Sequence, residues 1–135
     1  MRNIKYKAYI KEYDVIAEVE QLELLLASGE VQSIVVSDWE LTGETYRFTK
    51  GQFALMEFTG YLDSGDNDVY SGQIIECGVK DNVKVFQGFK AVVVWGNTYK
   101  TYGIEHPTEG FCPLWHLYGF KIIGSIYQDK ELLNG

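Results

Sequence analysis

Apolar and polar residues alternate along much of the chain, which predicts a mainly β fold. Residues 44–49 alternate polar and apolar side chains, and residues 79–86 alternate Val79, Asp81, Val83 and Val85 with polar residues; this period is typical of a strand with one buried face. Residues 92–95 form a continuous apolar run and predict a strand buried on both faces. Further strands are predicted over residues 31–38, over residues 120–127 and in two parts of residues 55–76.

Glycine and asparagine residues separate these strands at short intervals. Such breaks occur at residues 41–43, 88, 96–97 and 109–110, a spacing typical of a β-barrel or β-sandwich. Gly60 and Gly72 each stand where a strand must break or begin, so we expect both to adopt a positive φ and to be structural. A short helical turn is also expected over residues 128–133, because Asp129 can cap it.

Residues 14–28 fit two different elements. Val15, Val19, Leu22 and Leu26 follow helical spacing, with an aspartate and a glycine able to cap the two ends. The same segment also places leucines at every second position, and residues 27–30 can form a hairpin turn into the strand that follows. An N-terminal hairpin and a helix-plus-strand element both remain open.

Three blocks of the chain resemble one known family. Residues 55–76 read LMEFTGYLDSGDNDVYSGQIIE, with a Thr-Gly pair, an acidic turn and a Tyr-Ser-Gly start to the next strand. This pattern resembles the central signature of the YopX family of small phage and prophage proteins. Residues 1–8 resemble the opening of that family, and residues 119–133 resemble its end. At Gln73 the family usually has an aspartate.

The resemblance implies a small SH3-like barrel and a phage or prophage setting, and it assigns no activity. A hydrophobic content of 46% with few prolines excludes a disordered chain. The 135 residues contain no linker-like tract, so we expect a single domain over residues 1–135. Its N-terminal element would cover about residues 1–50 and its barrel-like part about residues 51–135.

The charge of the chain narrows the classes of partner. The net charge is −7 and the 12 Lys and Arg residues are dispersed, whereas a nucleic-acid groove needs clustered basic residues. Only Arg2, Lys5, Lys7 and Lys11 approach a cluster, so we expect no direct binding to nucleic acid. An acidic nucleic-acid mimic that inhibits a host DNA-binding protein remains an alternative function.

The lengths of the apolar runs indicate whether the chain can span a membrane or carry a signal peptide. A run such as residues 91–95 is far shorter than the roughly 20 residues of a membrane span. Residues 1–15 mix charged and apolar side chains, unlike a signal peptide. We therefore expect no membrane partner, and a cytoplasmic protein in a bacterial host cell.

The cysteines and histidines offer one possible constellation for chemistry. Cys77, His106, Cys112 and His116 are potential zinc ligands, and they define a metal-dependent enzyme as a further alternative. A zinc module shows paired ligands such as C-x-x-C, and neither Cys77 nor His106 has such a neighbour. No local feature activates either thiol as a nucleophile. We therefore expect buried structural cysteines, no catalytic residue, no metal and no cofactor.

The acidic turn at residues 63–68 suggests calcium, but it lacks the register of a calcium-binding loop. Counting twelve positions from Asp63, Ser64 or Asp66 reaches Ile74, Ile75 or Cys77 in place of glutamate. A solvated turn in which Asp and Asn bond their own backbone is favoured.

The aromatic residues are the stronger functional indication. Five of them lie close together among glycines and prolines, in a segment with few strand signals: Tyr99, Tyr102, Phe111, Trp115 and Tyr118. Such rings are frequent anchors in protein interfaces, although they can also cover the open end of a small barrel. We predict a non-enzymatic phage or prophage accessory protein that binds a protein partner. Strands with two apolar faces further predict self-association as a homo-oligomer.

Overall fold

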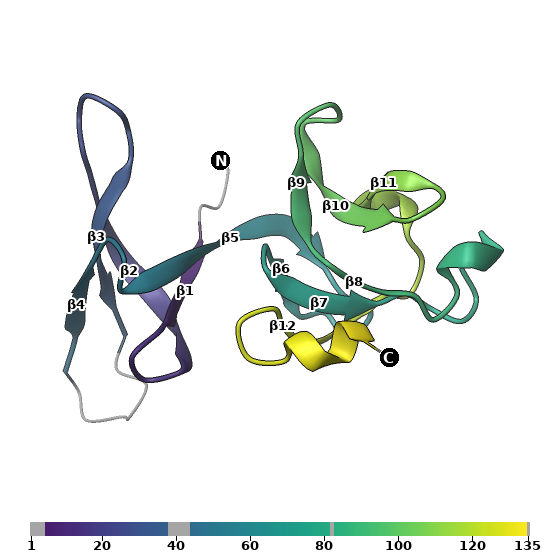
Figure 1. The fold of residues 1–135 in the computed structure, drawn as a ribbon, viewed down its shortest axis with the longest axis horizontal. Helices are drawn as coiled ribbons and strands as arrows, with labels where there is room; N and C mark the ends of the chain where they lie inside the picture. The colour runs from purple at the N-terminus through teal and green to yellow at the C-terminus, as the bar shows by residue number, and fades with distance from the viewer. Residues whose placement is uncertain (1–4, 38–43, 82, 135) are drawn as a thin grey trace. The chain divides into compact units, whose positions relative to one another are not determined.

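The computed structural model describes residues 5–37, 44–81 and 83–134. The protein is mainly β, and it divides into two compact units, Met1–Glu57 and Phe58–Gly135 (Figure 1). The single domain expected over residues 1–135 stays a prediction. Some features predicted from the sequence lie outside the described residues. They are Arg2, the start of the family-like opening block, the end of the predicted strand at Asp38 and the break at residues 41–43.

The first unit is an antiparallel sheet in which neighbouring strands follow the order β4-β3-β2-β1-β5. Its buried apolar side chains form one cluster, and pairs such as Ala8 and Ile10 or Ile34 and Val36 come from alternate positions. Its strands are β1 (Tyr6–Ile10), β2 (Val15–Leu24), β3 (Val31–Val36), β4 (Tyr46–Thr49) and the first part of β5 (Phe53–Leu62).

The N-terminal segment is a hairpin, so the hairpin alternative is confirmed and the helix alternative is wrong. The first half of β2 pairs with β1 and its second half pairs with β3, so strand partners bond its backbone along its length. The register of the β2–β3 pair shifts between Val19 and Gln21. Apolar residues therefore change from odd to even positions after Val19, and the resulting spacing of Val15, Val19 and Leu22 imitates a helix.

The second unit contains two three-stranded antiparallel sheets, in the orders β11-β10-β9 and β12-β7-β8, and β6 pairs with the end of β5. One apolar core, which includes Val69, Ile75, Ile104 and Leu114, fills it. Its elements are β6 (Asp68–Tyr70), β7 (Gln73–Glu76), β8 (Lys90–Val92), β9 (Val94–Gly96), β10 (Thr101–His106), β11 (Gly110–Pro113) and β12 (Lys121–Ser125), with the 3-10 helices η1 (Lys84–Phe86), η2 (Leu114–His116) and η3 (Lys130–Asn134).

The expected SH3-like barrel is not confirmed, because none of the sheets formed by the described residues closes into a barrel. The strand predicted over residues 79–86 is wrong. The buried Asp81 accepts hydrogen bonds from the backbone N–H groups of Val83 and Tyr118, at 3.0 Å each, and holds the segment as a loop that leads into η1. The strand predicted over residues 92–95 is divided between β8 and β9 at Val93.

Gly60 and Gly72 have φ values of +88° and +86°. Gly60 does not end its strand, as the sequence suggested, but lies inside β5 where the pairing with β6 is irregular. Gly72 joins β6 to β7, and a Cβ atom there would lie 2.9 Å from the Tyr127 ring. The predicted C-terminal turn is present as η3. The Asp129 carboxylate, however, accepts the Ser125 N–H, which precedes the helix.

Candidate functional site

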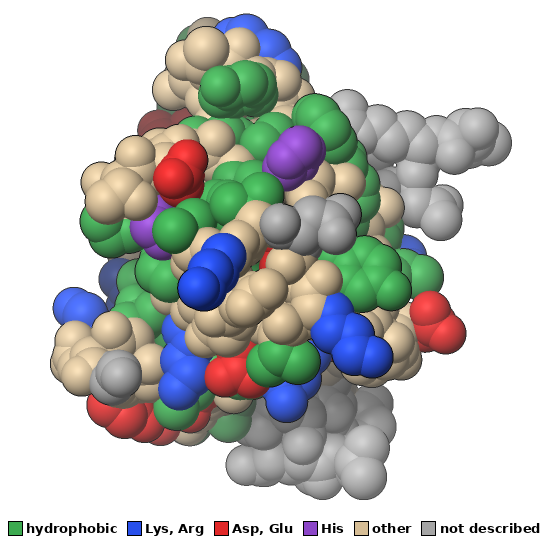
Figure 2. Space-filling view, turned by 90° about the vertical axis from the view of Figure 1, so that its right-hand side faces the viewer, with side chains coloured by type: hydrophobic (Ala, Val, Ile, Leu, Met, Phe, Trp, Pro, Cys, Tyr) green, Lys and Arg blue, Asp and Glu red, His purple; other side chains and the backbone are tan. Residues whose placement is uncertain are grey.

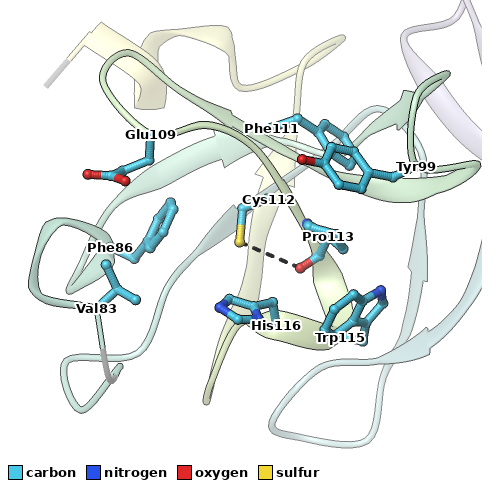
Figure 3. A pocket seen from close by; sticks show the side chains of 9 residues that line it. All are labelled: Val83, Phe86, Tyr99, Glu109, Phe111, Cys112, Pro113, Trp115 and His116. Carbon is cyan, nitrogen blue, oxygen red and sulfur yellow. Dashed lines mark hydrogen bonds between the residues drawn. The ribbon is translucent and has the colours of Figure 1, made fainter.

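An open pocket of about 310 Å³ lies on the second unit (Figure 3). We call it the aromatic groove. Val83, Phe86 and Glu109 lie on one side of it, and Tyr99 and Phe111 on the other (Figure 3). The nine residues that line it are Val83, Phe86, Tyr99, Glu109, Phe111, Cys112, Pro113, Trp115 and His116.

Three elements position these side chains. The β10–β11 hairpin brings Glu109 and Phe111 to the groove, and η2 follows directly at Pro113. Leu114 is fully buried and anchors η2, whereas the next two residues, Trp115 and His116, are exposed. The third element is the loop that ends in η1, which contributes Val83 and Phe86.

The Phe111 ring lies in space left free by two glycines. A Cβ atom at Gly96 or Gly103 would come within 2.4 or 2.7 Å of the ring, so only glycine fits at either position. Tyr99 stacks on this ring, at 5.4 Å between centroids and 19° between planes. The stacked pair forms a preformed apolar wall.

Three of the five predicted aromatic residues line the groove, and two do not. Tyr99, Phe111 and Trp115 line the groove. Tyr102 is buried in the core, where its ring packs at 5.0 Å against Trp95. Tyr118 is exposed but does not line the groove. Figure 2 shows apolar side chains around the histidines on this side of the molecule.

Besides the His116 imidazole, three polar groups at the groove have no hydrogen-bond or ion-pair partner among residues 5–37, 44–81 and 83–134. They are the Tyr99 hydroxyl, the Trp115 indole N–H and the Glu109 carboxylate. The exposed Trp95 differs, because its indole N–H donates to Asn97 Oδ1 at 3.1 Å. The Tyr99 and Trp115 side chains are also 58% and 63% exposed. The groove therefore offers both apolar rings and unused polar groups to a ligand.

The cysteines and histidines do not come together as a set of metal ligands. In the described part of the chain, no three His, Cys, Asp or Glu side chains lie together as metal ligands would. His106 packs against Phe86 and Phe89, at 5.1 and 4.6 Å between ring centroids, and its Nδ1 accepts the Thr108 N–H. The structure thus gives no support to the metal-dependent enzyme.

Both thiols are buried and free. Burial, with smaller contributions from Asp81, Cys112 and Glu76, raises the pKa of Cys77 to about 12. Burial and then Asp81 also raise the pKa of Cys112. A thiol needs a lowered pKa to act as a nucleophile near neutral pH, so neither cysteine is activated.

The acidic turn has a structural function in the second unit. Asp63 is only 7% exposed, and its carboxylate accepts hydrogen bonds from the N–H groups of Gly65, Asn67 and Ile122 and from the Asn67 side chain. Burial on its own raises the pKa of Asp63, but the hydrogen bonds from Asn67, Ile122 and Gly65 outweigh it and lower the pKa. The turn is therefore tied to β12, and the expectation of a merely solvated turn is wrong for Asp63.

Comparison with known proteins agrees with this fold. The model of the YopX protein family matches residues 5–134. The chain belongs to the YopX family. This YopX-family chain is similar to the crystal structure of protein EF1440 from Enterococcus faecalis, with a TM-score of 0.70 and 18% identity over 98% of this chain and 99% of that chain. At this identity the likeness shows the fold alone. No curated protein matches the chain.

The family resemblance is therefore confirmed. No helix among the described residues is both long enough and apolar enough to cross a membrane. Sequence reasoning missed six lining residues of the groove, namely Val83, Phe86, Glu109, Cys112, Pro113 and His116. An isolated glutamate in a turn carries no sequence signal, and the segment that contains Val83 and Phe86 was predicted to be a strand.

Proposed function

We propose that this YopX-family protein is a non-enzymatic phage or prophage accessory protein that binds another protein through the aromatic groove. The observation that carries the proposal is the exposure of Tyr99 and Trp115 at a preformed pocket. Tyr and Trp are enriched among the residues that dominate binding energy in protein interfaces. The family's phage and prophage setting supports an accessory protein that acts in the cytoplasm of a bacterial host.

The size and chemistry of the groove favour a side chain of a partner over a substrate. Its volume of about 310 Å³ is at the lower end of the roughly 300–1,000 Å³ of small-molecule sites. The one thiol that lines it, Cys112, has a raised pKa and is buried. These features support binding without chemistry.

Self-association is the second part of the proposal, and the loop between β2 and β3 supports it. Leu25 and Leu26 are exposed there, as is Leu24 at the end of β2, and Leu26 is 100% exposed. Hydrogen bonds from Leu25 N to Glu30 O at 2.8 Å and from Gly29 N to Leu25 O at 2.7 Å order the loop. An ordered apolar surface of this kind is a usual contact site between protein molecules.

Nucleic-acid mimicry is the weaker candidate. A mimic needs rows of free carboxylates in place of phosphates, yet two glutamates of the β2–β3 hairpin are paired. Glu23 forms an ion pair with Arg47, and Glu30 forms one with Lys50. These pairs reduce the acidic field of the hairpin.

Site-specific photo-cross-linking in the host cell tests the proposed function. A photoreactive phenylalanine analogue replaces Tyr99 at the groove in one protein and Trp95, outside the groove, in the other. We expect a partner protein to be cross-linked from position 99 and not from position 95. Equal cross-linking at the two positions, or none at position 99, would contradict binding through the groove.

A further inference from the structure

The aromatic groove carries an acidic group at an otherwise apolar site, and this combination defines the chemistry of a partner. We infer that the groove binds an arginine side chain presented by an extended, proline-containing segment of another protein. The inference rests on the proposed function and adds the chemical identity of the bound segment.

The charge of the groove selects a cationic group. Among the described lining residues, Glu109 is the one carboxylate and none is a Lys or Arg. Within the described ranges, the Glu109 side chain forms no ion pair or hydrogen bond. Lys84 and Lys100 adjoin lining residues in sequence, but neither faces the pocket as a lining residue. A cation from a partner would therefore be complementary to Glu109.

The rings select arginine among cations. A guanidinium group is planar, stacks on aromatic faces and bonds a carboxylate through two parallel N–H groups. Figure 3 shows Glu109 across the groove from Tyr99 and Trp115, with Cys112 between them. A side chain that passes the rings and reaches Glu109 must cross this apolar floor, and the aliphatic stem of arginine suits that path.

The exposed polar groups select an extended backbone. The Trp115 indole N–H and the Tyr99 hydroxyl are both available at exposed rings, so each can donate to a backbone carbonyl of a bound segment. A polyproline II segment has no internal hydrogen bonds, and its carbonyl groups stay free for such donors. Grooves lined with aromatic residues bind proline-containing segments in this way.

Single-stranded nucleic acid also stacks on aromatic rings, but the charge of the groove opposes it. A nucleic-acid site pairs its rings with Lys and Arg residues that follow the phosphates. The aromatic groove has Glu109 instead, in a chain of net charge −7. A protein segment is therefore the occupant that the charge favours.

Synthetic peptides test the inference with the full-length protein. The probe is a fluorescent proline-rich peptide that contains one arginine. Two matched peptides replace the arginine by glutamine or the prolines by alanine. Binding is measured by fluorescence anisotropy up to millimolar concentrations of protein, and we expect the arginine-proline peptide to bind most tightly.

Variants of the protein locate the contacts. Glu109→Gln should weaken binding of the arginine peptide by about two- to fivefold, the range of an exposed ion pair, and leave the glutamine peptide unchanged. Trp115→Ala should weaken both by about tenfold or more. The controls Glu105→Gln and Trp95→Ala change the same residue types at a second pocket of the unit, and we expect them to bind like the wild type.

Equal affinity for the three peptides, no saturable binding, or an unchanged affinity in Trp115→Ala would each overturn the inference. If a protein is still cross-linked from position 99 in that case, the proposed function survives with a different partner chemistry. If Trp115→Ala instead changes the oligomeric state, the groove binds a second copy of the chain, and the arginine inference is again overturned.

Discussion

Asp63 ties the acidic turn to β12, and the Asp63→Asn variant tests this function. One carboxylate oxygen, Oδ1, accepts the N–H groups of Gly65 and Asn67, and the other, Oδ2, accepts the Ile122 N–H at 3.1 Å. Asparagine has nearly the same shape and can keep its oxygen toward the turn. Its NH₂ group then faces the Ile122 N–H, so two donors meet and that hydrogen bond is lost.

The expected loss follows from the burial of this contact. A hydrogen bond to a charged group contributes about 1.5–3 kcal/mol, and a buried N–H without an acceptor adds a penalty. Since Asp63 is 7% exposed, solvent cannot replace the carboxylate oxygen. We expect the Asp63→Asn variant to lose about 1.5–3 kcal/mol of unfolding free energy at pH 7.

The pH dependence gives a second readout of the same contact. The pKa of Asp63 is lowered in the folded protein, so its stabilising effect is fully present above the unfolded pKa of about 3.9. The effect is lost as the pH falls through the folded pKa. The difference in stability between the wild type and Asp63→Asn should therefore be constant near neutral pH and narrow below about pH 4.

Urea unfolding followed by tryptophan fluorescence measures both effects. Asp66→Asn is the matched control, because it removes the same charge from an exposed position of the turn, and asparagine tolerates its φ of +62°. The control should change stability by less than about 0.5 kcal/mol. If Asp63→Asn were as stable as this control at pH 7, the structural function of the turn would be wrong.

Three further predictions follow from the fold. Gly60→Val and Gly72→Val should each lower the unfolding free energy by about 1–3 kcal/mol because of the positive φ. The loss should be larger at Gly72, where Tyr127 leaves no space for a side chain. Thermal unfolding at the same temperature as the wild type would refute this prediction. A variant with both cysteines changed to alanine and both histidines to glutamine should keep partner binding; stoichiometric zinc in the wild type, or unfolding by a chelator, would contradict it. Light scattering should give a mass above 15.4 kDa that falls in Leu26→Ser; a monomer at tens of micromolar would refute self-association.

The strands that sequence reasoning predicted well are those in which one face alternates without interruption. β4 is an example, because it keeps a single register with β3 and its apolar residues Tyr46 and Phe48 stay in one phase. β2 does not, because the irregular pairing after Val19 moves the apolar residues by one position. The apolar residues of β2 therefore follow helical spacing, and only the pairing with β1 and β3 shows that the segment is a strand and not a helix.

The loop before η1 could not be predicted from the sequence for a different reason. Residues 79–86 alternate as a strand would, but Asp81 is buried and holds the backbone of Val83 and Tyr118. Because Asp81 and Tyr118 are remote in the sequence, no local pattern predicts this contact. One side of the aromatic groove depends on the loop, so the groove could not be predicted as a whole.

The candidate site was predicted in part for a related reason. The density of aromatic residues identified Tyr99, Phe111 and Trp115, which line the groove. It could not separate them from Tyr102, since Tyr102 lies in β10, whose residues 102–104 are all buried, whereas Tyr99 precedes that strand. The spacing of Gly96 and Gly103 has a physical reason that only the three-dimensional structure reveals, namely the position of the Phe111 ring.

The most direct test of the account is partner capture by three purified proteins from host cells that express the phage or prophage genes. The proteins are the wild type, Trp115→Ala at the groove and Trp95→Ala outside it, each first shown to unfold with similar free energy. Captured proteins are quantified by mass spectrometry. The account predicts a partner that the wild type and Trp95→Ala recover equally and that Trp115→Ala recovers about tenfold less or not at all. Recovery of the same proteins in the same amounts by all three would contradict binding through the aromatic groove.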